Sequence, residues 1–430
     1  PLARVLAGPP PAPPTQRIIF CEMNGAWDLL LSCDPRDPAR TYAGIELGSD
    51  LLASRYRDPR PATIGTGSFA RSTLLGSTTR ALDAHLDVLT LVRGMTMATV
   101  AHPTGRAYMA TGIAPAGSNA RGSSLGAALA NAYEEGGAPP ILPHVAMGTL
   151  SFNRQFPPTA TALGLDSPHD LPDLLTPNSR NLSRNAMANG ALEALLASAR
   201  EGTCITDAYT PIDPSTGAPA VSPSVEAIAA RDRLARIEDT SLASRFDFST
   251  PSAQALYGST VDQRSTPASA AATAAELVKS GLSAAVGVRL QSTLDTHRDW
   301  ATDQPALLEE AFDALGAMLT DLRDAGELET TMVVVHSEFG RQPTLNGSSS
   351  RDHWFANGAM IFGGPLVTGV FGETGQEDLG LVLVDPRTGR ASDAGDAVQL
   401  RPEHLFATLQ EALGLASIDY RYTALPLVRA

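Results

Sequence analysis

The sequence predicts an α/β fold, a three-layer α/β/α sandwich with a mostly parallel central sheet and a helical insertion. Three observations predict it. Short apolar runs of β-forming residues alternate along the chain with stretches of helical periodicity, which is typical of parallel strands joined by helices. Hydrophobic residues make up 43% of the 430 residues, enough for one large buried core. Turn-forming residues bound the apolar runs, so the strand ends lead into loops.

The N-terminal part of the chain predicts three strands. These strands are expected at 17–23, 88–94 and 141–147. Helices are expected at 78–85 and 124–135, and a loop running into a helix at 102–109. The first strand leads into a tight turn at Gly25, which places Asp28 at the carboxyl end of that strand.

The C-terminal part continues the alternation. Helices are predicted at 271–280, 304–325 and 402–413, of which the second is long and amphipathic. Strands are predicted at 284–290, 332–335, 358–364 and 382–385.

Residues 151–270 differ in composition from the segments on either side. They are rich in Ala, Ser, Thr, Asn and Pro, with helical patches at 188–200 and 224–237. No sharp linker separates them, so we expect a mostly helical insertion or cap within a single domain of residues 17–430.

Residues 1–16 have a different character. Leu2 to Gly8 resembles the end of an export signal and runs into a stiff proline-rich linker. This segment predicts an exported protein, periplasmic or secreted.

Charge and cysteine content exclude several classes of protein. The net charge of −14 and the pI near 5.0 argue against nucleic acid or anionic lipid as partners. No apolar run approaches the length of a transmembrane segment. Three cysteines are too few for a disulfide scaffold, although a Cys21–Cys33 bridge could form in an oxidising compartment. Patterns typical of serine hydrolases, nucleotide loops and redox centres are absent from the sequence.

The segment from Leu290 to Gly364 carries most of the chemistry. Carboxylates and imidazoles follow apolar strands or a Gly/Ser loop at three points: Asp295 with His297, then Glu338, then Asp352 with His353. Side chains at the carboxyl ends of neighbouring strands meet at one edge of an α/β sheet, and mixed oxygen and nitrogen ligands suit a divalent cation. The sequence therefore predicts a site for Zn, Mn, Mg or Ca, which Asp28 would complete from the first strand.

Each candidate also has a structural interpretation. Asp295 could cap the following helix, with His297 on the surface. Glu338 could form a salt bridge with Arg341, and the Asp352–His353 pair could be solvated. Their occurrence together in the same strand-end context favours ligands.

His102 and Arg106 form a second candidate pair. They stand four residues apart and share one face if a helix begins near His102, and the free amides of a helix N-terminus favour a bound anion. The other histidines lack such company and are expected to be structural: His85, His144, His169, His336 and His404.

The strand-end motifs resemble the bacterial domain of unknown function 1501 family. The resemblance rests on Asp295-Thr-His297, on Ser337-Glu-Phe-Gly-Arg341, and on Asp352-His353 with the later Phe362-Gly-Gly. Gly25-Ala-Trp-Asp28 resembles the opening of one branch of that family. The likeness covers most of residues 17–374, and members are typically exported, often through a twin-arginine leader.

That family is in turn similar to the alkaline phosphatase and sulfatase superfamily, which implies an alkaline phosphatase-like fold. The resemblance implies that Asp28 is the first-strand metal ligand, that Asp295 and His297 bind the first metal, and that His353 is the late histidine. Glu338 replaces an aspartate of the superfamily pattern, and Phe339 replaces a histidine.

The segment from His102 to Gly112 resembles the sulfatase nucleophile segment. His102 then stands at the nucleophile position and Arg106 at that of the activating arginine. His102 could act as a nucleophile, a general base or a metal ligand, and Thr104 could instead supply a hydroxyl.

The expected function is that of an exported metal-dependent hydrolase of phosphate or sulfate esters. Its substrate would be a small or polymer-borne anionic ester, held by Arg106 or Arg341, with residues 151–270 shaping the leaving-group pocket. The alternatives are a non-catalytic cell-envelope protein that keeps the fold, and a metal-dependent esterase.

Overall fold

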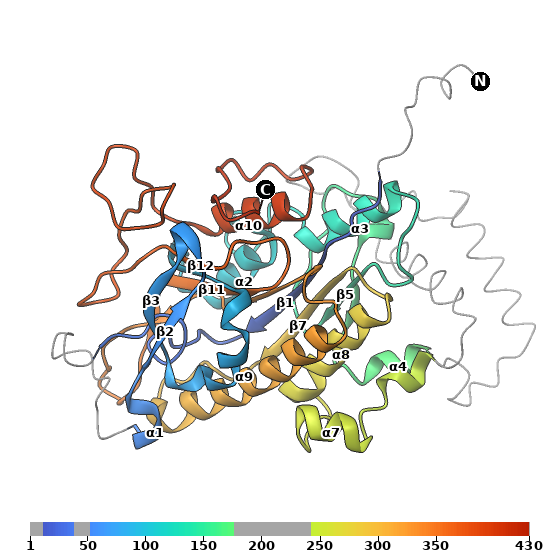
Figure 1. Cartoon of the computed structure of the whole chain (residues 1–430), viewed down its shortest axis with the longest axis horizontal. Coiled ribbons are helices and arrows are strands. Elements are labelled where there is room, and N and C mark those ends of the chain that lie inside the picture. The colour runs from blue at the N-terminus through green and yellow to red at the C-terminus, as the bar shows by residue number, and fades with distance from the viewer. Residues whose placement is uncertain (1–11, 38–51, 176–241, 430) are drawn as a thin grey trace, which may run out of the picture.

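The computed structural model describes residues 12–37, 52–175 and 242–429, and it is built around one large sheet (Figure 1). The strands of this sheet are, in chain order, β1 (Arg17–Met23), β4 (Leu89–Thr96), β5 (His144–Met147), β6 (Leu163–Leu165), β7 (Ala285–Gln291), β8 (Thr331–His336), β11 (Ala356–Phe362) and β12 (Gly369–Phe371). Their spatial order is β12-β4-β11-β8-β1-β7-β5-β6. β11 is antiparallel to both of its neighbours, and the other pairs are parallel. The predicted mostly parallel central sheet is confirmed.

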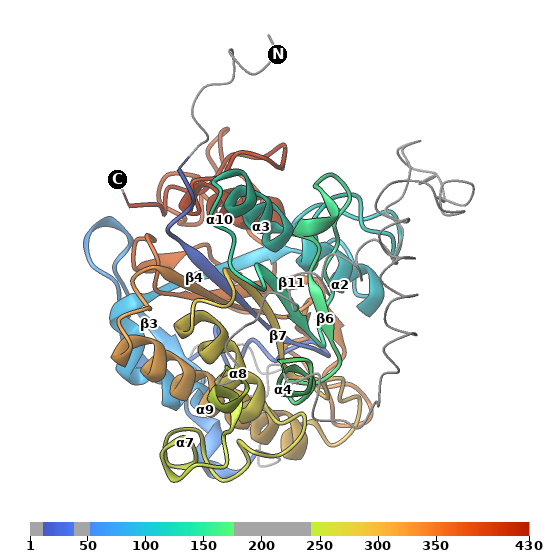
Figure 2. The same cartoon turned by 90° about the vertical axis from the view of Figure 1, so that its right-hand side faces the viewer.

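Helices cover both faces of the sheet (Figures 1 and 2). One face is covered by α8 (Pro267–Lys279) and α9 (Trp300–Asp324), with the 3₁₀ segment η3 (Ser77–Val88) beside α9. The other face is covered by α2 (His102–Thr111), α3 (Leu125–Glu135) and α10 (Pro402–Ala412).

Alternating side chains of the strands contribute to the two hydrophobic cores, one on each face of the sheet. In β8, Met332 and Val334 pack with the α2–α3–α10 side, whereas Val333 and Val335 pack with the α8–α9 side. Successive side chains of a strand point to opposite faces, so a strand buried on both faces is apolar throughout. This is why the run of valines before His336 could be recognised as a central strand.

The remaining elements are short. They are α1 (Ser54–Arg57), β2 (Arg60–Ile64), η2 (Gly67–Phe69), β3 (Arg71–Leu75), η4 (Pro158–Ala160), α4 (Asp170–Leu175), η6 (Leu242–Phe246), α7 (Pro251–Tyr257), β9 (Gly340–Arg341) and β10 (His353–Trp354). β2 pairs with β3, and β9 pairs with β10, both antiparallel.

Some elements differ from the prediction. β6, inside the segment predicted to be mostly helical, adds an edge strand next to β5. The strand predicted at 382–385 is reduced to isolated bridges from Val384. The helical patches predicted at 188–200 and 224–237 lie outside the described residues. Cys21 and Cys33 are buried free thiols, not a disulfide, and no helix in the described part of the chain could cross a membrane.

The topology brings distant segments to one edge of the sheet. β1, β7, β8 and β4 all end there, because they run in the same direction. β11 runs in the opposite direction, so the residues just before it, including His353, reach the same edge. Loops at the carboxyl ends of parallel strands are where ligands bind in α/β folds.

Candidate metal centre

Asp295, just after β7, lies at the centre of a group of imidazoles. The Nε2 atoms of His353 and His297 lie 2.9 and 3.0 Å from its Oδ1, and the Nε2 of His102 lies 3.2 Å from its Oδ2. The Asp295 side chain is 45% exposed, so the group opens to solvent. We call Asp295, His102, His297 and His353 the Asp295 cluster.

Each imidazole of the cluster has an acceptor at its other nitrogen. The Nδ1 contacts are His102 to Glu338 Oε1 at 2.6 Å, His353 to the Val100 carbonyl at 2.9 Å, and His297 to Asp352 Oδ1 at 3.0 Å. A hydrogen on Nδ1 directed at such an acceptor leaves the Nε2 lone pair facing Asp295. Lone pairs facing a carboxylate are stable only with protons or a cation between them, and metal-binding histidines are held in this way.

The electrostatics agree with a site for positive charge. The hydrogen bond from His102 to Glu338 raises the pKa of His102 above its ordinary value, although partial burial opposes this. Burial alone would raise the pKa of Asp295, but hydrogen bonds from His353 and Arg341 and the charge of His102 hold it well below the usual range.

Glu338 is buried directly behind His102. Its Oε1 also accepts from the Gly25 amide at 2.9 Å, and its Oε2 accepts from the Ser337 hydroxyl at 2.9 Å. Burial acts to raise its pKa, but these hydrogen bonds and the one from His102 lower it. Glu338 was predicted to be a metal ligand; the structure places it as the residue that orients His102.

Asp352 supports His297 in the same manner. Its Oδ1 receives hydrogen bonds from His297 and from the Asn346 amide at 2.9 Å. The hydrogen bond from His297 lowers its pKa. Asp352 therefore lies behind an imidazole, whereas it was predicted to bind the metal directly.

Asp28 does not join the cluster. Its carboxylate is 1% exposed and accepts from the Trp300 indole at 2.7 Å and from the amides of Leu30 and Leu31 at 2.9 and 3.2 Å. Arg351 Nε lies 3.5 Å from the same carboxylate, and its guanidinium stacks 4.3 Å over the Trp300 ring. The prediction that Asp28 completes the metal site is corrected by these contacts, which already occupy both of its oxygens.

Arg341 is fully buried, and the surrounding backbone holds its guanidinium. Its guanidinium donates to the carbonyls of Gly25, Ala26, Leu294 and Arg351 and to Asp295 Oδ1 at 3.0 Å. It was predicted to bind the substrate anion and, alternatively, to pair with Glu338. The structure shows that it orients Asp295 instead.

Arg106 follows His102 by one turn of α2. Its Nε donates to Glu22 Oε1 at 3.0 Å, and its Nη groups make no hydrogen bond to the described residues. Of the two predicted anion-binding arginines, Arg106 has a partly exposed side chain, whereas that of Arg341 is fully buried.

Sequence reasoning missed three features of the site. Glu22, inside an apolar strand, is 6% exposed, and a charged residue in a buried strand was a signal that it needed a partner. The ring centroid of Phe339 lies 4.9 Å from that of His102 and 4.7 Å from that of His353, so Phe339 packs against both imidazoles. No sequence signal pointed to the carbonyl of Val100.

Three members of the cluster meet the geometric requirement of a metal site. One ligand atom each from His102, Asp295 and His353 lies within 4.8 Å of the others. Together with His297, they form a compact set of donors at the carboxyl edge of the sheet.

The fold and site define a mixed α/β protein with an imidazole–carboxylate cluster at the carboxyl edge of a large, mostly parallel sheet. Residues 15–417 match the family described as "Protein of unknown function (DUF1501)", and the chain belongs to that family. No curated protein matches the sequence. A crystal structure of Leishmania mexicana phosphoglycerate mutase at low cobalt concentration matches with 16% identity and a TM-score of 0.23. That match covers 38% of this chain and 28% of the mutase, too little to support any conclusion.

Proposed function

We propose that this protein is an exported metal-dependent hydrolase of phosphate or sulfate esters, with an active site of the alkaline phosphatase and sulfatase type. The observation that carries the proposal is the convergence of three Nε2 atoms on Asp295, each imidazole being fixed through Nδ1. The segment that resembles an export signal supports a periplasmic or secreted location.

The donor set fits a transition metal. Three imidazoles suit Zn, and the carboxylate also suits Mn, whereas Mg and Ca prefer oxygen ligands throughout. Exposed side-chain fractions of 45% for Asp295 and 47% for His297 leave the site open to solvent. Structural zinc sites are closed, and catalytic sites keep an open position, so the exposure supports catalysis over a purely structural ion.

The chain's own residues hold and orient the reactants. When bound, the ion would supply a Lewis acid beside Asp295 and lower the pKa of an attacking group. Glu338 fixes the tautomer of His102, and Arg341 holds Asp295 in place. Arg106, one helical turn from His102, directs its Nη donors at the anionic ester. Because the Nδ1 of His102 is bonded to Glu338 and its Nε2 faces Asp295 at 3.2 Å without a hydrogen bond, we assign it as a ligand and not as the nucleophile.

Metal analysis combined with turnover tests the proposal. Purified protein reconstituted with Zn or Mn should retain about one ion per chain by elemental analysis, and it should hydrolyse an aryl phosphate or an aryl sulfate in a chelator-sensitive manner. The Asp295→Asn variant should lose both properties. Asp87→Asn removes an exposed aspartate paired with Arg323 and should leave both unchanged.

Two results would contradict the proposal. Failure of the wild type to retain either metal would remove the site itself. Bound metal without turnover of either ester would favour the non-catalytic envelope protein that keeps a structural ion.

A further inference from the structure

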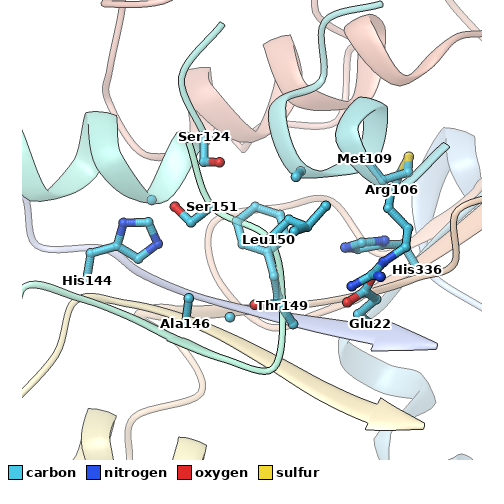
Figure 3. Close-up of a pocket in the computed structure, with 14 residues that line it drawn as sticks. Glu22, Arg106, Met109, Ser124, His144, Ala146, Thr149, Leu150, Ser151 and His336 are labelled. Carbon is cyan, nitrogen blue, oxygen red and sulfur yellow. The ribbon is translucent and has the colours of Figure 1, made fainter. Parts of the chain in front are cut away.

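A cavity lies under helices α2 and α3. Its floor comes from β1, β5, β7 and β8, and its roof from the loop after β5. We call it the β1–α3 cavity; it has a volume of about 40 Å³ and is lined by Phe20, Glu22, Arg106, Met109, Ala110, Ser124, Gly126, His144, Ala146, Thr149, Leu150, Ser151, Gly287 and His336 (Figure 3).

Buried polar atoms line this cavity without a protein partner. Glu22 Oε2, His336 Nδ1 and His144 Nδ1 make no hydrogen bond within the described chain, although each side chain is at most 6% exposed. Arg289 Nε lies 4.0 Å from Glu22 Oε2, beyond hydrogen-bond reach. Such groups are costly to bury unsatisfied, so their presence in one cavity points to a bound partner.

Glycines keep the cavity walls close to these polar groups. A Cβ at Gly126 would lie 2.5 Å from His144 Nε2, and a Cβ at Gly287 would lie 2.5 Å from Thr149 Oγ1. Larger residues at these two positions would displace the polar side chains that line the cavity.

The lining chemistry defines the ligand. Glu22 and Arg106 neutralise each other at one end, where His336 also lies, and His144 lies at the other end (Figure 3). Burial lowers the pKa of both histidines to about 4, so both are neutral at pH 7. Burial raises the pKa of Glu22, and the charge of Arg106 opposes this. With Arg106 Nε bonded to Glu22 Oε1, the cavity interior carries no net charge that would bind an ion, and Glu22 Oε2 is left as an acceptor for a donor group.

We infer that the β1–α3 cavity binds a small uncharged molecule or group carrying hydroxyls, one of which donates to Glu22 Oε2. The volume admits about three water-sized groups, the size of a short diol. Phe20, Met109 and Leu150 provide the apolar wall that the carbon atoms of such a ligand would contact.

The position of the cavity suggests what this group belongs to. Arg106 lines the cavity and lies one turn of α2 from His102, so an ester whose anionic group lies at the Asp295 cluster would have its alcohol portion in the cavity. This last step rests on the proposed function, and it makes the cavity the subsite for the alcohol side of the ester.

Direct binding of 1,2-ethanediol tests the inference without any turnover. Saturation-transfer NMR should detect the diol on the wild-type protein. Glu22→Gln removes the charged acceptor and should weaken binding at least about tenfold. Ala146→Leu fills the cavity from β5 and should abolish binding, so this variant carries the test if Glu22→Gln does not fold. The matched control Glu135→Gln, an exposed change at the end of α3, should bind like the wild type.

The outcomes separate this inference from the proposed function. No diol binding by the wild type, or equal binding by the wild type and both cavity variants, would overturn the inference. Both cavity variants should retain the metal content of the wild type, because neither residue belongs to the Asp295 cluster. If the wild type binds the diol but turns over neither ester, the proposed hydrolase function is contradicted and the inference about the cavity stands.

Discussion

The loops that follow β1 and β7 start from neighbouring strands and end in opposite environments. β1 and β7 are parallel and hydrogen-bonded, and an aspartate follows each of them by a few residues. Asp28, after β1, is 1% exposed and sealed by Trp300 and Arg351. Asp295, after β7, is 45% exposed and faces three imidazoles.

The difference shows what strand-end position does and does not determine. Both aspartates reach the carboxyl edge, as the topology of a parallel sheet requires. Partners from elsewhere in the chain then decide their roles: an indole and a guanidinium make Asp28 part of the buried structure, whereas imidazoles with fixed tautomers make Asp295 a site for a cation. Substitutions on the two sides should therefore affect different measurements.

The largest expected effect is on the buried side. Asp28→Asn removes the buried negative charge that lies 3.5 Å from Arg351 Nε and should lower the free energy of unfolding by about 3–5 kcal/mol, measured by urea titration. Metal content should stay at the wild-type level in the folded fraction. Asp87→Asn, at an exposed ion pair, should change stability far less. Loss of metal with unchanged stability would instead make Asp28 a ligand.

The burial of His144 predicts that the free energy of unfolding depends on pH. Burial lowers the pKa of His144 to about 4, whereas an unfolded histidine titrates near pH 6.5. The unfolded state therefore binds more protons between these values, so stability is full above pH 6.5 and falls as the pH drops toward 4. The loss from His144 amounts to about 3 kcal/mol at most.

Unfolding free energies of His144→Gln and wild type at several pH values test this. The variant should show a flatter decline of stability between pH 6.5 and 4. Thr302→Ser, an exposed change near the start of α9 that involves no titratable group, should keep the wild-type slope. A wild-type slope in His144→Gln would mean that His144 is not held neutral by burial.

Sequence reasoning reached the parallel sheet and the segment from Asp295 to His297 because both follow from local pattern. Apolar runs of strand length predict buried strands, and residues two apart at a strand end share a face. Pairing across the fold could not be predicted in this way. Nothing near Asp28 in the sequence indicates that Arg351 will neutralise it, and the three residues of β6 are too few to show a period.

At the Asp295 cluster, the sequence predicted the positions of the residues better than their roles. Strand-end logic put Glu338 at the correct edge, but its depth of burial depends on how Gly25 packs over it. Its spacing from Arg106 made His102 a candidate, and the family resemblance offered it as a nucleophile, a general base or a metal ligand. Only the folded structure places its Nε2 beside Asp295. Distances between segments 200 residues apart in sequence depend on tertiary packing, which a local pattern does not contain.

Glu338→Gln tests whether the buried carboxylate acts through His102. Gln keeps the shape but removes the charge opposite His102 Nδ1, and loss of such an outer partner typically weakens metal affinity about 10–100-fold. Competition with a chromophoric chelator measures this, and Glu373→Gln, which breaks the ion pair with Arg71, serves as the control. The variant should still bind one ion at saturating metal. Complete loss of binding would make Glu338 a direct ligand, as the strand-end pattern predicted.

The smallest effect is expected at Asp352. Its solvent-exposed carboxylate contacts His297 Nδ1, as the buried Glu338 contacts His102 Nδ1. Its side chain is 44% exposed, so solvent screens its charge and can replace it as the acceptor for His297 Nδ1. Asp352→Asn should weaken metal affinity less than about tenfold, below the effect of Glu338→Gln in the same titration. The order of the two variants matters more than either value, because both carboxylates contact an imidazole at Nδ1 and differ mainly in burial. An Asp352 effect equal to or larger than that of Glu338 would mean that Asp352 contacts the ion itself, and the distinction drawn between supporting carboxylates and ligands would fail.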